Sequence, residues 1–167
     1  MRRLVLLRHA KSDYPVGVRD HDRPLAPRGR REAALAGTWL DANVPAVDLA
    51  LVSSATRTQQ TWQIASAQLN SVPRWQSEPR IYEASVSELL EVLADVADEV
   101  STVLLVGHNP GTEFLASWLA GSSRGDSLER LEMKYPTSAI AVFETDFGWA
   151  ELDRGCAELV SFVVPRG

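Results

Sequence analysis

Residues 4–11 read LVLLRHAK, and this stretch decides how the fold begins. Leu4–Leu7 is an uninterrupted apolar run, which is typical of a strand that is buried on both faces of a sheet. The run ends at Arg8 and His9, two polar side chains that are not typical of a hydrophobic core. A buried strand that ends in this pair predicts a sheet with a functional site at its carboxyl edge.

Strand and helix signals alternate along the rest of the chain. Ser85 and Glu88 match the capping box S-x-x-E and predict a helix start, while Asn109 fits an N-cap and Pro110 the first position of a helix. The predicted helices are residues 27–42, 56–69, 85 onward and 109–120. The predicted strands are residues 4–7, 48–52, 102–106, 138–144 and 158–164, with a short extended piece at 80–82.

Such alternation indicates βαβ units, which wind right-handed into a parallel sheet with helices on both faces. We therefore predict a three-layer α/β/α sandwich with a mostly parallel sheet, in which the last two strands add an antiparallel edge. The 167 residues suit one domain, residues 1–167, and no repeat or linker interrupts them.

Composition excludes several classes of protein. The formal net charge of −5 gives no basic field that would attract nucleic acid. The apolar run after Arg2 and Arg3 is too short for a signal peptide, and no segment approaches the roughly 18 apolar residues of a membrane span. A single cysteine, Cys156, excludes an intramolecular disulfide and a cysteine-based zinc cluster. We expect a cytoplasmic protein without membrane or nucleic-acid partners; its oligomeric state is left open.

Three predicted strand ends carry unusual side chains: Arg8 and His9 follow the first, Arg57 the second and His108 the strand at 102–106. Carboxyl ends of parallel strands share one edge of a sheet, where ligands bind. Arg57 falls in the first helical turn, where the helix dipole disfavours a cation unless an anion lies between them. Two arginines and two histidines that converge there predict a site for a phosphoryl dianion.

A neutral imidazole can attack phosphorus, while arginines stabilise the charge on the phosphoryl oxygens. Such a site needs no metal or other cofactor. A metal site built from His9, His21, His108 and nearby carboxylates is the alternative, but the neighbouring arginines disfavour a dication there.

The stretches LLRHAKS (6–12), SSATRTQQT (53–61) and VGHNPG (106–111) resemble the signatures of the histidine phosphatase superfamily, which has the phosphoglycerate mutase-like fold. DHDRPLAPRGRREA and IYEAS look most like its small prokaryotic phosphohistidine phosphatase branch. The resemblance implies that His9 is the nucleophile and passes through a phosphohistidine intermediate. It also implies that Arg8, Arg57 and His108 bind the phosphate.

Larger members of that family carry a long insertion with an acidic proton donor, for which this chain has little room. Glu83 is our candidate acid, ahead of Asp13, Asp20 and Asp22. A short lid favours a phosphohistidine side chain on a protein as substrate, because a phosphoramidate needs less help from an acid than an oxygen ester. The alternatives are a phosphomonoesterase for a small phosphorylated metabolite and a non-catalytic phosphoanion-binding module.

Overall fold

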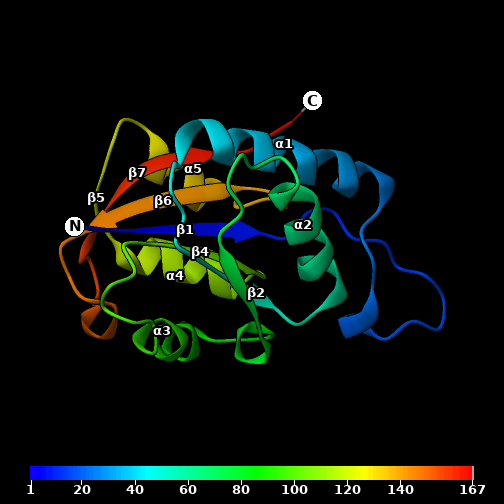
Figure 1. Ribbon diagram of the computed structural model, residues 1–167, viewed down its shortest axis with the longest axis horizontal. Coiled ribbons are helices and arrows are strands. Elements are labelled where there is room, and N and C mark those ends of the chain that lie inside the picture. The colour runs from blue at the N-terminus through cyan, green and yellow to red at the C-terminus, as the bar shows by residue number, and fades with distance from the viewer. Residues whose placement is uncertain (167) are drawn as a thin grey trace.

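β1 (Arg2–Arg8) lies in the middle of a sheet of seven strands in the computed structural model, which describes residues 1–166 (Figure 1). The strand order is β3-β2-β4-β1-β6-β7-β5. The other strands are β2 (Leu49–Ser53), β3 (Arg74–Glu78), β4 (Thr102–Gly107), β5 (Ala120–Ser123), β6 (Ile140–Thr145) and β7 (Ala157–Val163).

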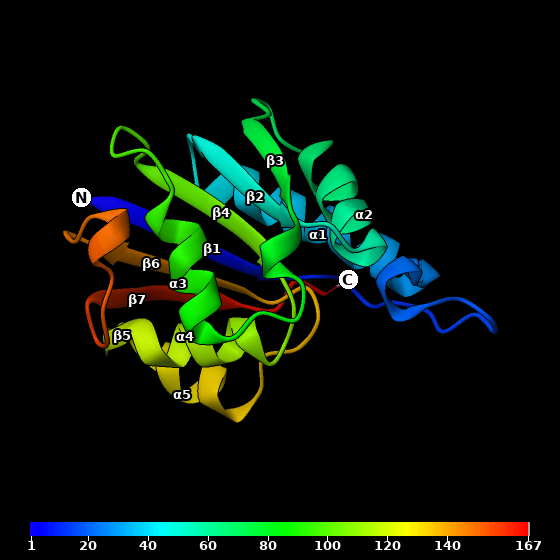
Figure 2. The same ribbon diagram turned by 90° about the horizontal axis from the view of Figure 1, so that it is seen from below.

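Five α-helices cover the two faces of this sheet, so the predicted three-layer architecture is confirmed. α1 (Pro27–Asn43) and α2 (Thr56–Ser66) cover one face, and the other three cover the opposite face (Figure 2). These three are α3 (Val86–Ala94), α4 (Gly111–Leu119) and α5 (Ser127–Met133). Three short 3-10 helices complete the described residues 1–166: η1 (Asp20–Asp22), η2 (Pro79–Ile81) and η3 (Trp149–Glu151).

The apolar run at the start of the chain divides its side chains between the two faces. Leu4 and Leu6 belong to the core beneath α3, α4 and α5, whereas Val5 and Leu7 belong to the core beneath α1 and α2. Each side chain is at most 2% exposed. Full burial of one such side chain contributes about 1.5–3 kcal/mol, which explains why β1 shows no polar alternation.

The last two strands pair antiparallel, as predicted, but they do not form the edge of the sheet. β6 is not an edge: it runs antiparallel between β1 and β7, and nearly all its residues are buried. The edge on that side is β5, which pairs parallel with β7. An antiparallel insertion in a parallel sheet depends on long-range pairing, which the local pattern of apolar residues does not encode.

Two local predictions were wrong. The piece at 80–82 is not extended, because residues 79–81 form η2 after an unpredicted edge strand, β3, whose side chains are mostly exposed. α4 begins at Gly111 with Pro110 as its N-cap residue, one position later than predicted. The side chain of Asn109 does not cap the helix but donates to the carbonyl of Tyr135.

Within residues 1–166, no helix has the length and apolar character needed to cross a membrane.

Candidate active site

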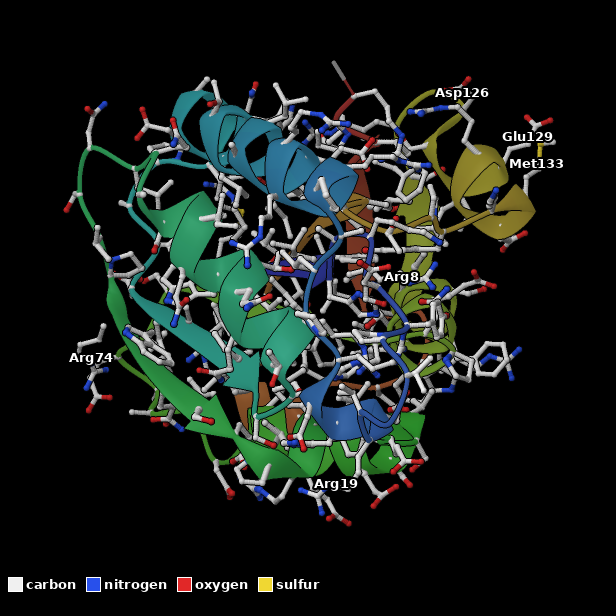
Figure 3. All side chains as sticks on the ribbon, turned by 90° about the vertical axis from the view of Figure 1, so that its right-hand side faces the viewer. Arg8, Arg19, Arg74, Asp126, Glu129 and Met133 are labelled. Carbon is white, nitrogen blue, oxygen red and sulfur yellow. The ribbon has the colours of Figure 1, made fainter. Side chains whose placement is uncertain are left out.

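The end of β1 places Arg8 and His9 at the carboxyl edge of the parallel strands, as predicted. Figure 3, which shows the side of the molecule toward which β1 points, has Arg8 near the middle of that side and Arg19 near its margin. The backbone N–H of His9 donates to the carbonyl of Gly107 at 3.0 Å. The end of β1 is thereby fixed against the end of β4, which delivers His108.

His9 is held in one tautomer. Its side chain is buried, and Nδ1 lies 2.7 Å from the carbonyl oxygen of Ala10. A carbonyl only accepts, so Nδ1 carries the proton and Nε2 keeps its lone pair. Burial, together with the nearby cations Arg57 and Arg8, lowers the pKa of His9 to about 3. The imidazole is therefore neutral at pH 7 and has a free Nε2.

Arg8 and Arg57 are both anchored at their outer nitrogens. Nη1 of Arg8 donates to the carbonyl of Tyr135 at 2.8 Å. In Arg57, the second residue of α2, Nη1 donates to the carbonyl of Asp20 at 2.6 Å and Nη2 to its carboxylate at 3.1 Å. The Nε atoms of both arginines are buried and have no hydrogen-bond partner among residues 1–166. Buried donors without partners are costly, so these two N–H groups favour a negative charge placed nearby.

His108 follows β4 and faces His9. The two ring centroids are 5.3 Å apart, and Nε2 of His108 lies 2.7 Å from Oγ of Ser53. Burial lowers the pKa of His108 to about 3, with further contributions from His9 and Arg57. Its Nδ1 is also buried without a partner in the described part of the chain. A negatively charged group between the two rings would reverse the pKa shift and favour protonation of this histidine.

The surroundings of Asp20 are those of an ionised carboxylate and not of a proton donor. Its carboxylate accepts hydrogen bonds from the hydroxyl of Tyr82, from Arg57 and from Nε of Arg23 at 3.1 Å. These donors, Tyr82 first, hold the pKa of Asp20 well below its usual range, although burial opposes them. Asp20 therefore stays ionised at neutral pH and acts as an anchor for Arg57.

The sequence interpretation did not identify Arg23, Tyr82 or Ser53 as part of this site. Arg23 adds a further positive charge near His9, and Tyr82 packs its ring edge-on against His108 with centroids 5.4 Å apart. A signal was present for Arg23, because it follows Asp20 and Asp22 directly in the charged segment DHDR of the loop after β1. Ser53 begins the signature stretch SSATRTQQT, but a serine at a strand end is common and indicated no role of its own.

Glu83 lies beside this group of residues. It is exposed and adopts a left-handed backbone conformation, with φ of 57°. It lines a cleft of about 620 Å³ that reaches the carboxyl edge of the sheet at Arg57 and His108. The lining residues are Asp20, Arg57, Tyr82, Glu83, Ala84, Ser85, Val86, Glu88, His108, Asn109, Pro110, Gly111 and Phe114. Of the predicted residues, the structure thus brings Arg8, His9, Arg57 and His108 together and places Glu83 on the cleft that adjoins them.

A neutral imidazole beside several cationic and N–H donors is chemically able to attack a phosphoryl group. Comparison with known proteins identifies the family. The model of the histidine phosphatase superfamily (branch 1) matches residues 4–143, and the chain belongs to this family. It is a phosphatase of the phosphoglycerate mutase-like fold.

Particular relatives cover nearly the whole chain. An uncharacterized protein of Mycobacterium tuberculosis is 50% identical over 162 residues, which are 96% of this chain and all of that protein. A structure from Nakamurella multipartitia assigned as the phosphohistidine phosphatase SixA has 34% identity and a TM-score of 0.87, with 99% of this chain and 97% of that chain covered. A structure from Agrobacterium tumefaciens with the same SixA assignment has 31% identity and a TM-score of 0.80, with 98% of both chains covered.

Proposed function

We propose that the protein hydrolyses phosphohistidine on other proteins through a phosphohistidine intermediate on His9. The observation that carries this proposal is the state of His9: Nδ1 is bound to the carbonyl of Ala10, and the free Nε2 is surrounded by arginines. Arg8, Arg57 and His108 bind the phosphoryl oxygens, and each of them has a buried side-chain nitrogen without a hydrogen-bond partner among the described residues, which favours a negative charge nearby. The SixA assignment of the structure at 34% identity supports the same substrate class.

The reaction proceeds in two displacements. In the first, Nε2 of His9 attacks phosphorus while the bond from phosphorus to the substrate nitrogen breaks, and the leaving imidazole nitrogen takes up a proton from water in the open cleft. In the second, water attacks the phosphorylated His9, the bond between Nε2 and phosphorus breaks, and inorganic phosphate leaves. The arginines stabilise the charge on the three phosphoryl oxygens in both transition states.

The lack of room for a lid supports a protein substrate. Between Arg57 and His108 the chain is used for the rest of α2 and for β3, η2, α3 and β4, all of which belong to the sheet or pack near it. A cleft that remains open can admit a side chain on another protein.

Phosphoenzyme trapping tests the nucleophile. The protein is mixed with a labelled phosphoramidate in excess EDTA, quenched within milliseconds, and the adduct is exposed to acid and to base. We expect an acid-labile, base-stable adduct that is lost in His9→Ala and kept in His21→Gln, which serves as the histidine control. Absence of an adduct, with turnover that requires an added divalent metal, would refute the proposal.

We also propose Glu83 as the proton donor for leaving groups that need one. It is exposed on the same cleft as Arg57 and His108, so a leaving group in the cleft can approach it. Glu83→Gln should slow hydrolysis of an alkyl phosphate, whose alkoxide needs a proton, far more than hydrolysis of a phosphoramidate. Equal losses for both substrates would assign Glu83 another role.

A further inference from the structure

The cleft continues beyond Arg57 and His108 into a surface of which, in the proposed reaction, only Glu83 has a role. This surface, here called the outer wall, consists of Glu83, Val86, Glu88, Pro110 and Phe114. We propose that the outer wall binds a basic segment of the substrate protein next to its phosphohistidine. The inference rests on the proposed function, because it concerns the part of the substrate that flanks the phosphoryl group.

The charge of the outer wall is negative. Among the residues that line the cleft, Asp20 and Arg57 form an ion pair with each other, with Oδ2 and Nη2 3.1 Å apart. Glu83 and Glu88 are then left without a cation among the lining residues. Both are exposed, and the hydrogen bond from the backbone N–H of Ser85 lowers the pKa of Glu88, which keeps it ionised. The carboxylates oppose a second anionic group on the substrate and attract a cation.

The rest of the outer wall is apolar. The side chain of Phe114 is 57% exposed, although large apolar side chains are usually covered, and it lies on the same cleft as Val86 and Pro110. Lysine and arginine carry long apolar stems below their charged ends, and a cation is also attracted to the face of an aromatic ring. An apolar surface next to two carboxylates therefore matches the two parts of a basic side chain.

Two features hold the outer wall in place: the capping box of α3 and the close packing of the loop before α3 against α4. The capping box fixes Glu88, because its Oε1 accepts from the backbone N–H of Ser85 at 3.0 Å while Ser85 Oγ accepts from the N–H of Glu88 at 3.2 Å. The loop before α3 packs directly on the start of α4: a Cβ on Gly111 would lie 2.5 Å from the carbonyl oxygen of Ala84. Preorganised charges discriminate between ligands without the cost of ordering a loop.

The occupant is a protein segment and not a small polyanionic metabolite. A metabolite that carries a carboxylate or a second phosphate would bring negative charge against Glu83 and Glu88. The cleft of about 620 Å³ is also as large as pockets for whole small molecules, so it has room for a phosphohistidine side chain and a neighbouring side chain. Charge complementarity and size together favour a basic neighbour in the substrate.

Three phosphohistidine peptides test this inference. They are identical except that the residues flanking the phosphohistidine are lysine, alanine or glutamate, and kcat/KM is measured for each at low and high salt. The expected order is lysine above alanine above glutamate. The difference between the lysine and glutamate peptides should be about three- to tenfold at low salt and should shrink at high salt, as for exposed ion pairs.

The variant Glu88→Gln removes the charge and keeps the helix cap, because glutamine also serves at this position of a capping box. It should reduce the lysine preference by about half or more. Glu91→Gln, on the same helix but not among the lining residues, should leave the preference unchanged. Phe114→Ala should lower kcat/KM for all three peptides.

Every other outcome contradicts either the further inference or the proposed function. Equal kcat/KM for the lysine and glutamate peptides, or a lysine preference that survives Glu88→Gln, would overturn the inference while the proposed function stands. Faster hydrolysis of a small cationic phosphoramidate than of the lysine peptide would show that the outer wall binds a small cationic metabolite and not a protein segment. Failure to hydrolyse any peptide, with turnover of a phosphomonoester, would overturn the proposed function and the inference with it.

Discussion

Lowering the pH from 7 to 5 should cost the folded protein stability through His9 and His108. The pKa of each is about 3 in the folded protein and about 6.5 in the unfolded chain. Below pH 6.5 these two histidines therefore bind protons in the unfolded chain but not in the folded protein. The contribution of these histidines is fully present above about pH 6.5 and is lost as the pH falls toward about 3.

The size of this loss follows from the shift. Each pH unit below 6.5 is worth about 1.36 kcal/mol per histidine, and pH 5 lies about 1.5 units below. The free energy of unfolding should fall by about 2 kcal/mol for each histidine and about 4 kcal/mol for both. This is a large part of the roughly 5–15 kcal/mol that stabilises a protein domain.

Urea-induced unfolding at pH 7, 6 and 5 measures the effect. Other groups also titrate in this range, so the informative quantity is the difference between the natural protein and the double variant His9→Gln, His108→Gln. The natural protein should lose about 4 kcal/mol more than the double variant, and each single variant should fall between them. The control His21→Gln removes an imidazole outside the buried pair. Parallel pH profiles for the natural protein and the double variant would refute a neutral, buried His9.

Three further predictions concern the supports of the site. Asp20→Ala should lower kcat/KM about tenfold, because Arg57 loses a charge-assisted hydrogen bond, and Asp20→Asn should lose less; unchanged kinetics in both would contradict the anchoring of Arg57. Gly111→Ala places a methyl group against the carbonyl of Ala84 and should cost about 1–3 kcal/mol in urea unfolding; an unchanged midpoint would show that the loop yields. Ser85→Ala should cost about 1 kcal/mol by the same assay, whereas Ser85→Thr keeps the cap and should cost less.

The sequence predicted the parts of the fold that depend on local patterns. The apolar runs that became β1 and β4 are buried on both faces, so they lack polar residues and stand out in the sequence. The start of α3 was also predictable, since the capping box is a local arrangement of Ser85 and Glu88. β3 was missed because its side chains are mostly exposed, and an edge strand of this kind has no apolar pattern.

By itself, the sequence determined that Arg8, His9, Arg57 and His108 stand at strand ends on one edge of a sheet, since parallel strands leave no other place for them. Only the tertiary structure decided their chemical state. The burial that keeps His9 and His108 neutral depends on water being excluded, and the contact between Asp20 and Arg57 joins residues 37 positions apart. Such interactions arise from packing in three dimensions, and the spacing of residues along the chain does not specify them.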